Sequence, residues 1–135
     1  YIKTLEYDKV IHKLSTYCKT YIGKENVISI LPEFNRDKVV NSLKFTTEAI
    51  SLIYRKGNLP ISDVPDISVS IKALNSYSVL SSLRLINIAN FLKISREVKE
   101  YLFSSDDINL TEYPKVYDMF DLIYTNKNIE EKIFL

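Results

Sequence analysis

Apolar residues recur at intervals of three and four along most of this chain, which is the spacing of one face of an α-helix. The first two runs predict helices over residues 5–18 and 20–31, with Thr4 and Thr20 as N-caps. The second helix must end before Pro32, because a proline disfavours the helical conformation in the residue that precedes it. The predicted core residues of the two helices are Leu5, Val10, Ile11, Leu14, Tyr17, Cys18, Ile22, Val27, Ile30 and Leu31.

The clearest helical period predicts a third helix over residues 36–56. Gly57 then serves as its C-terminal cap, after Arg55 and Lys56, whose positive charges suit the negative end of the helix dipole. The predicted core face of this helix consists of Val39, Val40, Leu43, Thr46 or Thr47, Ile50, Ile53 and Tyr54.

A connection with two prolines, residues 58–65, follows the third helix. Asp66 can cap a short helix over residues 67–75, and Ser81 or Ser82 can cap a long helix that ends near residue 103. Apolar residues cover more than one stripe of the long helix in its first three turns. We therefore expect other helices to surround it there, which would make it the central helix.

The last third of the chain begins with a polar stretch, residues 104–112. Pro114 opens a helix to about Tyr124, and Asn128 opens one more helix that runs to the end. No segment reads as a strand, because prolines interrupt the weak alternation of residues 58–71. The pattern predicts an all-α fold, a single irregular bundle of six to seven helices. The expected core face of the Pro114 helix is Val116 or Tyr117, Phe120 and Ile123.

Size and charge narrow the function classes. A length of 135 residues with 46% hydrophobic and 26% charged residues predicts one compact domain. A net charge of +1 and an isoelectric point near 7.9 do not provide the basic stripe of a domain that binds nucleic acid by itself. No apolar run could span a bilayer, and a single cysteine fits a reducing compartment, so we expect a cytoplasmic protein with no membrane partner.

Active-site motifs are absent from the sequence. Two glycines 34 positions apart cannot form a phosphate-binding loop. His12 and Cys18 are too few for a zinc site. They point to different faces of one helix, which argues against a catalytic pair, and Cys18 is interpreted as a small buried hydrophobic residue. We predict no catalytic, cofactor-binding or metal-binding residue. The neighbouring carboxylates, which we expect to be solvated, are Asp106 and Asp107, Asp118 and Asp121, and Glu130 and Glu131.

Ten tyrosines and six phenylalanines raise the alternative of a base-stacking surface. Such a surface needs exposed aromatic rings beside basic groups. The positions of these rings on or beside apolar stripes favour a core role instead. The rings concerned are Tyr17, Phe45, Tyr54, Phe91, Tyr101 and Phe120.

The motifs along the chain resemble those of the bacterial MutS-two subfamily, relatives of the MutS mismatch-repair ATPases. The opening T-L-E-Y-x-K-V-I, the T-x-x-G-K-E segment and the following L-P match the family pattern. "TTEAISLI" at 46–53 resembles its T-x-E-A helix, and residues 63–92 resemble its next two helices. The matching residues at the start are Thr4, Leu5, Glu6, Tyr7, Lys9, Val10, Ile11, Thr20, Gly23, Lys24, Glu25, Leu31 and Pro32. The departures are Tyr77-Ser78, where the family has glycine, and Ser82, Leu83 and Arg84, where acidic residues are common.

The resemblance implies that residues 1–135 form a noncatalytic helical core domain, the N-terminal fragment of a longer ATPase, which also fits a chain without an initial methionine that stops within a predicted helix. The implied parent is a homodimeric clamp on branched DNA or ribosomes. It suppresses homologous recombination, rescues collided ribosomes and carries a C-terminal Smr endonuclease domain. ATP and magnesium would bind in the parent's ATPase domain, with no cofactor in this fragment. Alternatives are a stand-alone helical adaptor with an exposed apolar patch and a small magnesium enzyme with a carboxylate-lined pocket.

Gly23 occupies the first turn of the second predicted helix, where glycine costs helix stability. The resemblance implies that this helix passes close to its neighbours, so the missing side chain would let two backbones approach; a special loop conformation is the alternative. A Gly23→Leu variant is then expected to melt several degrees lower through overpacking.

Overall fold

The computed structural model describes residues 6–104 and 108–135. Within these ranges the chain forms seven α-helices and one short 3₁₀-helix with no strand, which confirms the predicted all-α fold. The elements are α1 (Tyr7–Ser15), α2 (Tyr21–Ile28), α3 (Arg36–Lys56), α4 (Ser68–Asn75), α5 (Ser82–Phe103), η1 (Leu110–Glu112), α6 (Pro114–Asp121) and α7 (Lys127–Phe134).

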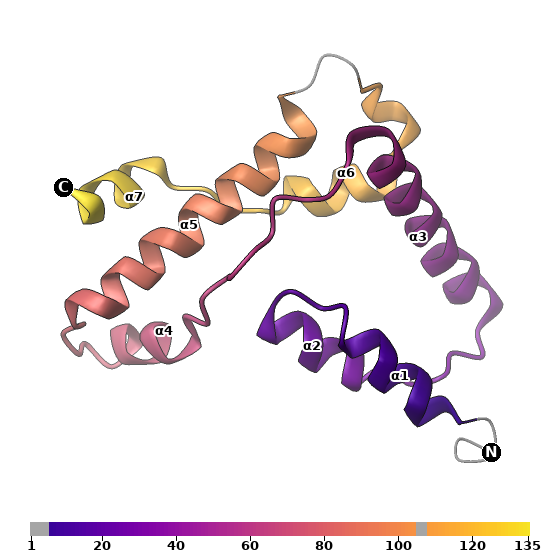
Figure 1. The fold of residues 1–135 in the computed structure, drawn as a ribbon, viewed down its shortest axis with the longest axis horizontal. Coiled ribbons are helices and arrows are strands. Elements are labelled where there is room, and N and C mark those ends of the chain that lie inside the picture. The colour runs from indigo at the N-terminus through magenta and orange to yellow at the C-terminus, as the bar shows by residue number, and fades with distance from the viewer. Residues whose placement is uncertain (1–5, 105–107) are drawn as a thin grey trace.

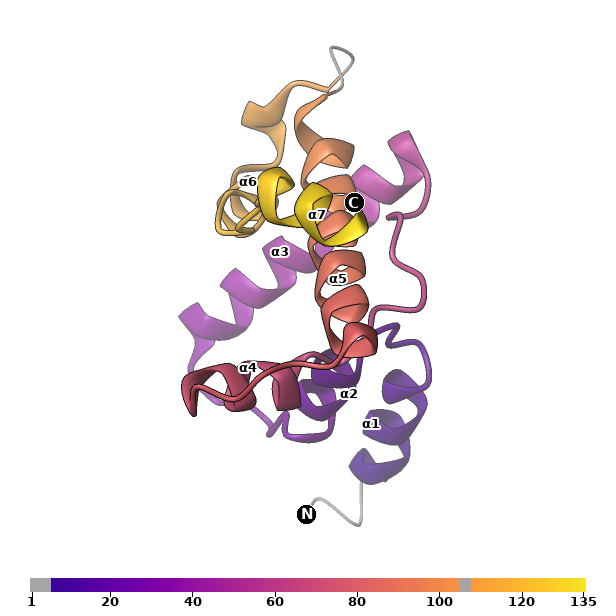
Figure 2. The same cartoon turned by 90° about the vertical axis from the view of Figure 1, so that its left-hand side faces the viewer.

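The two long helices, α3 and α5, form arms that converge where α6 lies (Figure 1). The short helices α1 and α2 pair with each other as a hairpin, and α7 packs along α5. Figure 2 shows α7 against the side of α5 from a second direction. An extended segment, residues 58–67, leads from the end of α3 to α4 (Figure 1).

The buried core lies where α3, α5, η1 and α6 meet. Val116 and Phe120 of α6 are buried there, as the sequence predicts. Ile108 and Tyr113 are buried as well, although they flank a segment whose polar composition gives no sign of burial. The whole buried cluster is Leu52, Val98, Leu102, Ile108, Tyr113, Val116 and Phe120.

The prediction that α5 is surrounded in its first three turns holds only in part, because the start of the helix is open. Leu83 is 68% exposed, and Ile86 is exposed too. Ala89, within these turns, is fully buried, but the α5 residues that join the buried core cluster come later, at Val98 and Leu102. The helix is therefore central to the fold through its C-terminal half, where α3 and α6 supply the opposing side chains.

The expected compactness is wrong. The chain exposes 10422 Å². A compact protein of 15.7 kDa exposes about 7,300 Å². The fold is open because the N-terminal hairpin and most of α3 contribute few side chains to the core.

The N-terminal hairpin contributes to this exposure. In α1 only Ser15 is buried, whereas Val10, Leu14 and Tyr17 of the predicted core face are exposed. The Tyr7 hydroxyl donates to a backbone carbonyl beyond α2 at 3.1 Å, which joins the two ends of the hairpin. The predicted residues Thr4 and Leu5 lie outside the described residues.

Most helix ends follow the capping residues that the sequence offers. Thr20, Ser81 and Gly57 occupy the predicted cap positions, and Gly57 has φ of 88°, which glycine adopts without strain. The helix α6 ends at Asp121, three residues earlier than expected. The last helix is capped by Asn126 rather than by Asn128.

Candidate functional site

The start of α6 is held by a side chain from another helix. Tyr113 precedes α6 and offers no capping side chain, and Pro114 has no N–H. The first two free backbone N–H groups, at Lys115 and Val116, both donate to Glu48 Oε2 of α3, at 2.8 and 3.1 Å. The carboxylate also suits the positive end of the helix dipole. Glu48 is thus a cap supplied across 67 residues of sequence.

The end of α6 is held by α5. Lys99 Nζ donates to the carbonyl oxygens of Asp121 and Ile123, at 3.2 and 3.0 Å. A cation there satisfies carbonyls that have no partner within the helix and suits the negative end of its dipole. An anion from α3 and a cation from α5 therefore fix α6 at opposite ends. We call this arrangement, Glu48 with α6 and Lys99, the α6 clamp.

The C-terminal end of α3 is tied to its neighbours by two cations. Arg55 Nη1 contacts Glu112 Oε2 of η1 at 2.9 Å, and its hydrogen bonds to Tyr113 and Glu112 raise the pKa of Arg55. Lys56 donates to the backbone carbonyl of Tyr101 and lies 4.7 Å from that ring's centroid. Burial raises the pKa of the Tyr101 hydroxyl. These contacts orient the arm formed by α3.

The helix α7 is attached to α5 by a charged cluster. Arg96 donates through Nη2 and Nε to the two carboxylate oxygens of Glu130, at 2.9 and 3.1 Å. Glu100 lies on the other side of the guanidinium, with its Oε2 3.3 Å from Nη1. The hydrogen bond from Arg96 lowers the pKa of Glu130, and the same bond raises the pKa of Arg96. Glu130 is buried, so the pair aligns α7 on α5.

The predicted core face of α3 is the part of the helix that the structure leaves open. Leu43, Ile50 and Ile53 are 60%, 50% and 40% exposed. The face that packs on α6 and α5 instead carries Phe45, Ala49 and Leu52. The prediction is wrong because two faces of this helix are apolar, and the residue spacing does not say which one the neighbours cover. We call the open stripe the α3 seam; it consists of Val39, Leu43, Thr46, Ile50 and Ile53.

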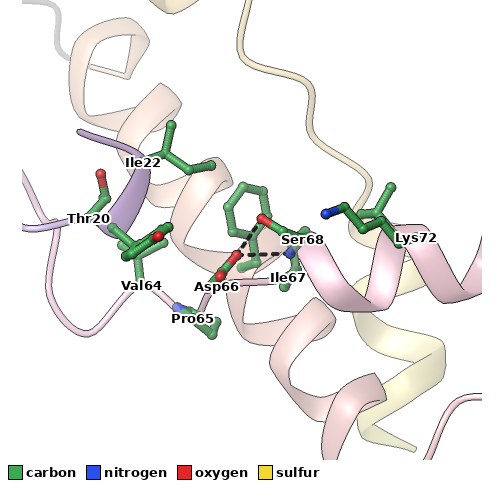
Figure 3. Close-up of a pocket in the computed structure, with 11 residues that line it drawn as sticks. Thr20, Ile22, Val64, Pro65, Asp66, Ile67, Ser68 and Lys72 are labelled. Atoms are coloured by element: carbon green, nitrogen blue, oxygen red, sulfur yellow. Dashed lines mark hydrogen bonds between the residues drawn. The ribbon is translucent and has the colours of Figure 1, made fainter. Parts of the chain in front are cut away.

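A hollow of about 520 Å³ lies between the start of α2, residues 64–68, α4 and α5 (Figure 3). Its single carboxylate, Asp66, accepts hydrogen bonds from the Ser68 hydroxyl and backbone N–H, which lower the Asp66 pKa. The carboxylate thus stabilises the first turn of α4, and this helix begins one residue later than predicted. The other charged group in the lining is Lys72, and most of the surface is apolar, including Ile22 and Val64. The hollow can accommodate an apolar side chain, but it does not present paired acid and base groups.

The residues considered for chemistry are not gathered at one place. His12 is exposed on α1, and Cys18 is half-buried with its thiol 3.9 Å from the Leu14 carbonyl oxygen. Glu130 pairs with Arg96, whereas Glu131 lies 3.7 Å from Lys127. Asp118 and Asp121 are exposed on α6, and Asp106 and Asp107 lie outside the described residues. Across residues 6–104 and 108–135, no three His, Cys, Asp or Glu side chains are grouped as a metal site would require.

The core role predicted for the aromatic rings holds only in part. Phe120 is buried, and the half-buried rings are Phe45, Phe91 and Tyr101. Tyr17 and Tyr54 are 66% and 87% exposed, so the prediction is wrong for these two. Both lie on faces that the chain leaves uncovered.

Gly23 has a different neighbour from the one predicted. Its N–H donates to Thr20 Oγ1 at 2.9 Å, and an added Cβ would stand 2.7 Å from that oxygen. No atom of another described helix lies within 4 Å of the added Cβ. The proposed close approach of two helices is therefore wrong, and the space that glycine leaves is filled by the cap of its own helix.

Sequence reasoning missed Glu48, Lys99 and Arg96 as organising residues. The one local signal is the Tyr113–Pro114 pair, which opens a helix without a side chain able to cap it. Such a start requires an acceptor from elsewhere in the fold, but the sequence does not say which one.

Curated proteins named Endonuclease MutS2 match nearly the whole chain. The protein from Alkaliphilus oremlandii is 30% identical over 134 residues, which are 99% of this chain and 17% of the relative. The protein from Acetivibrio thermocellus has the same identity and coverage. The protein from Lactobacillus helveticus is 32% identical over 123 residues, 90% of this chain and 16% of the relative.

The chain is thus similar to a fragment of a MutS2-family protein. It spans about one sixth of the length of the curated MutS2 relatives it matches. The resemblance drawn from the motifs is thereby confirmed, and the T-x-E-A segment of that resemblance is the one that supplies Glu48. No family model and no solved structure matches the chain. None of the described helices combines the length and apolarity needed to cross a bilayer.

Proposed function

We propose that this chain is a noncatalytic helical scaffold within a MutS2 protein, one that passes displacement between its two long helices. The supporting observation is the α6 clamp. Glu48 of α3 and Lys99 of α5 hold opposite ends of one short helix, and the buried cluster fills the space between them. A close-packed junction with charged contacts at both ends moves as a unit, because separating it would expose the buried cluster and leave the N–H groups of Lys115 and Val116 without their acceptor.

The wider role follows from the family. The relatives are named endonucleases, and we propose that the parent of this chain is a homodimeric ATPase that clamps branched DNA or ribosomes. ATP and magnesium would bind in its ATPase domain, and an Smr domain would provide the nuclease. In such a cytoplasmic protein, which would suppress homologous recombination and rescue collided ribosomes, this scaffold would connect the nucleotide state to the clamp.

The clamp can be tested in the full-length parent. Glu48→Ala is expected to leave basal ATP hydrolysis unchanged and to reduce its stimulation by branched DNA or ribosomes, because α3 and α5 would no longer move together. Glu48→Gln keeps one acceptor oxygen and should retain more of the stimulation. Full stimulation in Glu48→Ala, or ATP hydrolysis by residues 1–135 alone, would contradict the scaffold proposal.

A stand-alone adaptor remains the second candidate, because the exposed α3 seam is the apolar patch that such a protein would use. The two candidate functions predict different coding sequences. A reading frame that continues past Leu135 into further helices and an ATPase domain supports the scaffold, whereas a stop codon near Leu135 supports the adaptor.

A further inference from the structure

The α3 seam has the geometry of one half of a helix pair. Its five residues are separated by four, three, four and three positions, the spacing by which one helix inserts side chains between those of another. With about 100° between successive residues, the seam lies roughly a third of a turn from the Phe45–Leu52 face that packs on the core. The core therefore leaves the seam exposed from Leu43 to Ile53, whereas Val39 at its start is half-buried.

The seam is apolar despite its threonine. The Thr46 hydroxyl donates to the Ser42 carbonyl oxygen at 3.1 Å, and the neighbouring Thr47 hydroxyl donates to Leu43 at 2.9 Å. Both hydroxyls thus bond to their own helix backbone. The seam contains no charged residue, and its border carries Tyr54, which is 87% exposed. The surface fits an apolar helix face better than a charged ligand.

The length of the relatives suggests what covers the seam. The relatives are about six times as long as this chain, so most of such a polypeptide lies outside the structure. We propose that the α3 seam docks an amphipathic helix from another part of the same polypeptide. This inference rests on the proposed function and names its partner.

Single cysteines in the full-length parent, on a Cys18→Ser background, test the docking. Leu43→Cys and Ile50→Cys lie in the seam, and Lys44→Cys and Ser51→Cys on the same helix are matched controls. Each variant is labelled with maleimide in its native state and in concentrated urea. Mass spectrometry then measures how fast the peptide that carries each thiol is labelled. Relative to the unfolded rate, the seam thiols should react at least about tenfold more slowly than the control thiols, at every protein concentration.

A second measurement needs no substitution. Hydroxyl-radical oxidation of the wild-type parent should spare Tyr54, at the border of the seam, relative to Tyr77, which is 98% exposed in this chain. Equal labelling at seam and control positions, with equal oxidation of the two tyrosines, would overturn the proposal. Protection that disappears on dilution would also overturn it, in favour of a second copy of the chain. A coding sequence that ends near Leu135 would instead remove the proposed function itself.

Discussion

The α1–α2 hairpin and the α3–α5–α6 junction use the same sequence pattern with opposite results. Leu14 in the hairpin and Leu102 in the junction both lie on apolar helical stripes, yet Leu14 is 45% exposed and Leu102 is fully buried. In the junction, several elements that are distant in sequence converge on one cluster. In the hairpin, two helices of nine and eight residues contact mainly each other.

The difference shows that helical periodicity identifies a face able to be buried, whereas burial itself needs an opposing surface. Two short helices cover only a narrow line of each other, so most of each apolar stripe remains in solvent. The stability of the two regions should therefore differ even for chemically identical substitutions.

The largest expected difference comes from matched leucine substitutions. Leu102→Ala should lower the free energy of unfolding by about 2–5 kcal/mol, because it leaves a cavity in the junction. Leu14→Ala should cost less than about 1 kcal/mol, since much of that side chain is already in water. Urea denaturation of both variants measures the contrast, and equal losses would show that the two regions do not differ in packing.

The buried carboxylate of α7 should give the next largest effect. Glu130→Gln should cost about 1.5–3 kcal/mol near neutral pH, because it breaks a charged hydrogen-bond pair. The adjacent control, Glu131→Gln, loses only an exposed ion pair worth less than about 1 kcal/mol. If the two substitutions cost the same, the Arg96 pair does not hold α7 on α5.

The same pair predicts a pH dependence. The folded-state pKa of Glu130 is lowered, so its contribution is present above the unfolded pKa of about 4.3 and is lost as the pH falls through the folded value. The free energy of unfolding, measured from pH 6 to pH 3, should fall more steeply in the wild type than in Glu130→Gln. Identical slopes would contradict the lowered pKa.

The α6 clamp should make a smaller contribution. Glu48→Ala should cost about 1–2 kcal/mol, the usual loss when a helix N-cap is removed. Glu48→Gln should cost less, because its amide oxygen still accepts hydrogen bonds. Glu25→Ala in the hairpin, where the carboxylate caps no described helix, should stay within about 0.5 kcal/mol. Denaturation midpoints decide, and a cost for Glu25→Ala as large as that for Glu48→Ala would argue against the clamp.

The smallest effect is expected at Gly23. Gly23→Ala gains about 1 kcal/mol of helix propensity but displaces the Thr20 cap, which is worth a similar amount, so the melting temperature should barely move. In a Thr20→Ala background the obstruction is gone, and the same substitution should be stabilising. A large loss from Gly23→Ala alone would revive the close approach of a second helix.

Helix positions could be predicted from the sequence because their signals are local. Gly57 and the basic residues before it marked the end of α3, and Ser81 marked the start of α5. The face of α3 that packs on the core could not be predicted, because the helix has two apolar faces and the residues that cover one of them come from α5 and α6. Periodicity therefore selected the seam instead of the face that carries Leu52.

The candidate site was harder to predict, because its partners are far apart in sequence. Glu48 reads as an exposed helical carboxylate until α6 is placed beside it. Tyr113 is similar, since it lies next to a polar stretch and becomes buried only where η1 meets the junction. The family motifs mark the segment that contains Glu48, but they do not assign its contact.

The overhang of α3 has a mechanical consequence. Its contacts with the core begin at Phe45, and its first residue lies about 20 Å along the axis from Ala49. A tilt of α3 by only about 10° about Ala49 would move the start of the helix by about 3 Å, roughly the length of a hydrogen bond. A slight change in the orientation of the eight-residue helix α6 would thus become a larger displacement at the start of α3, large enough to make or break a contact there.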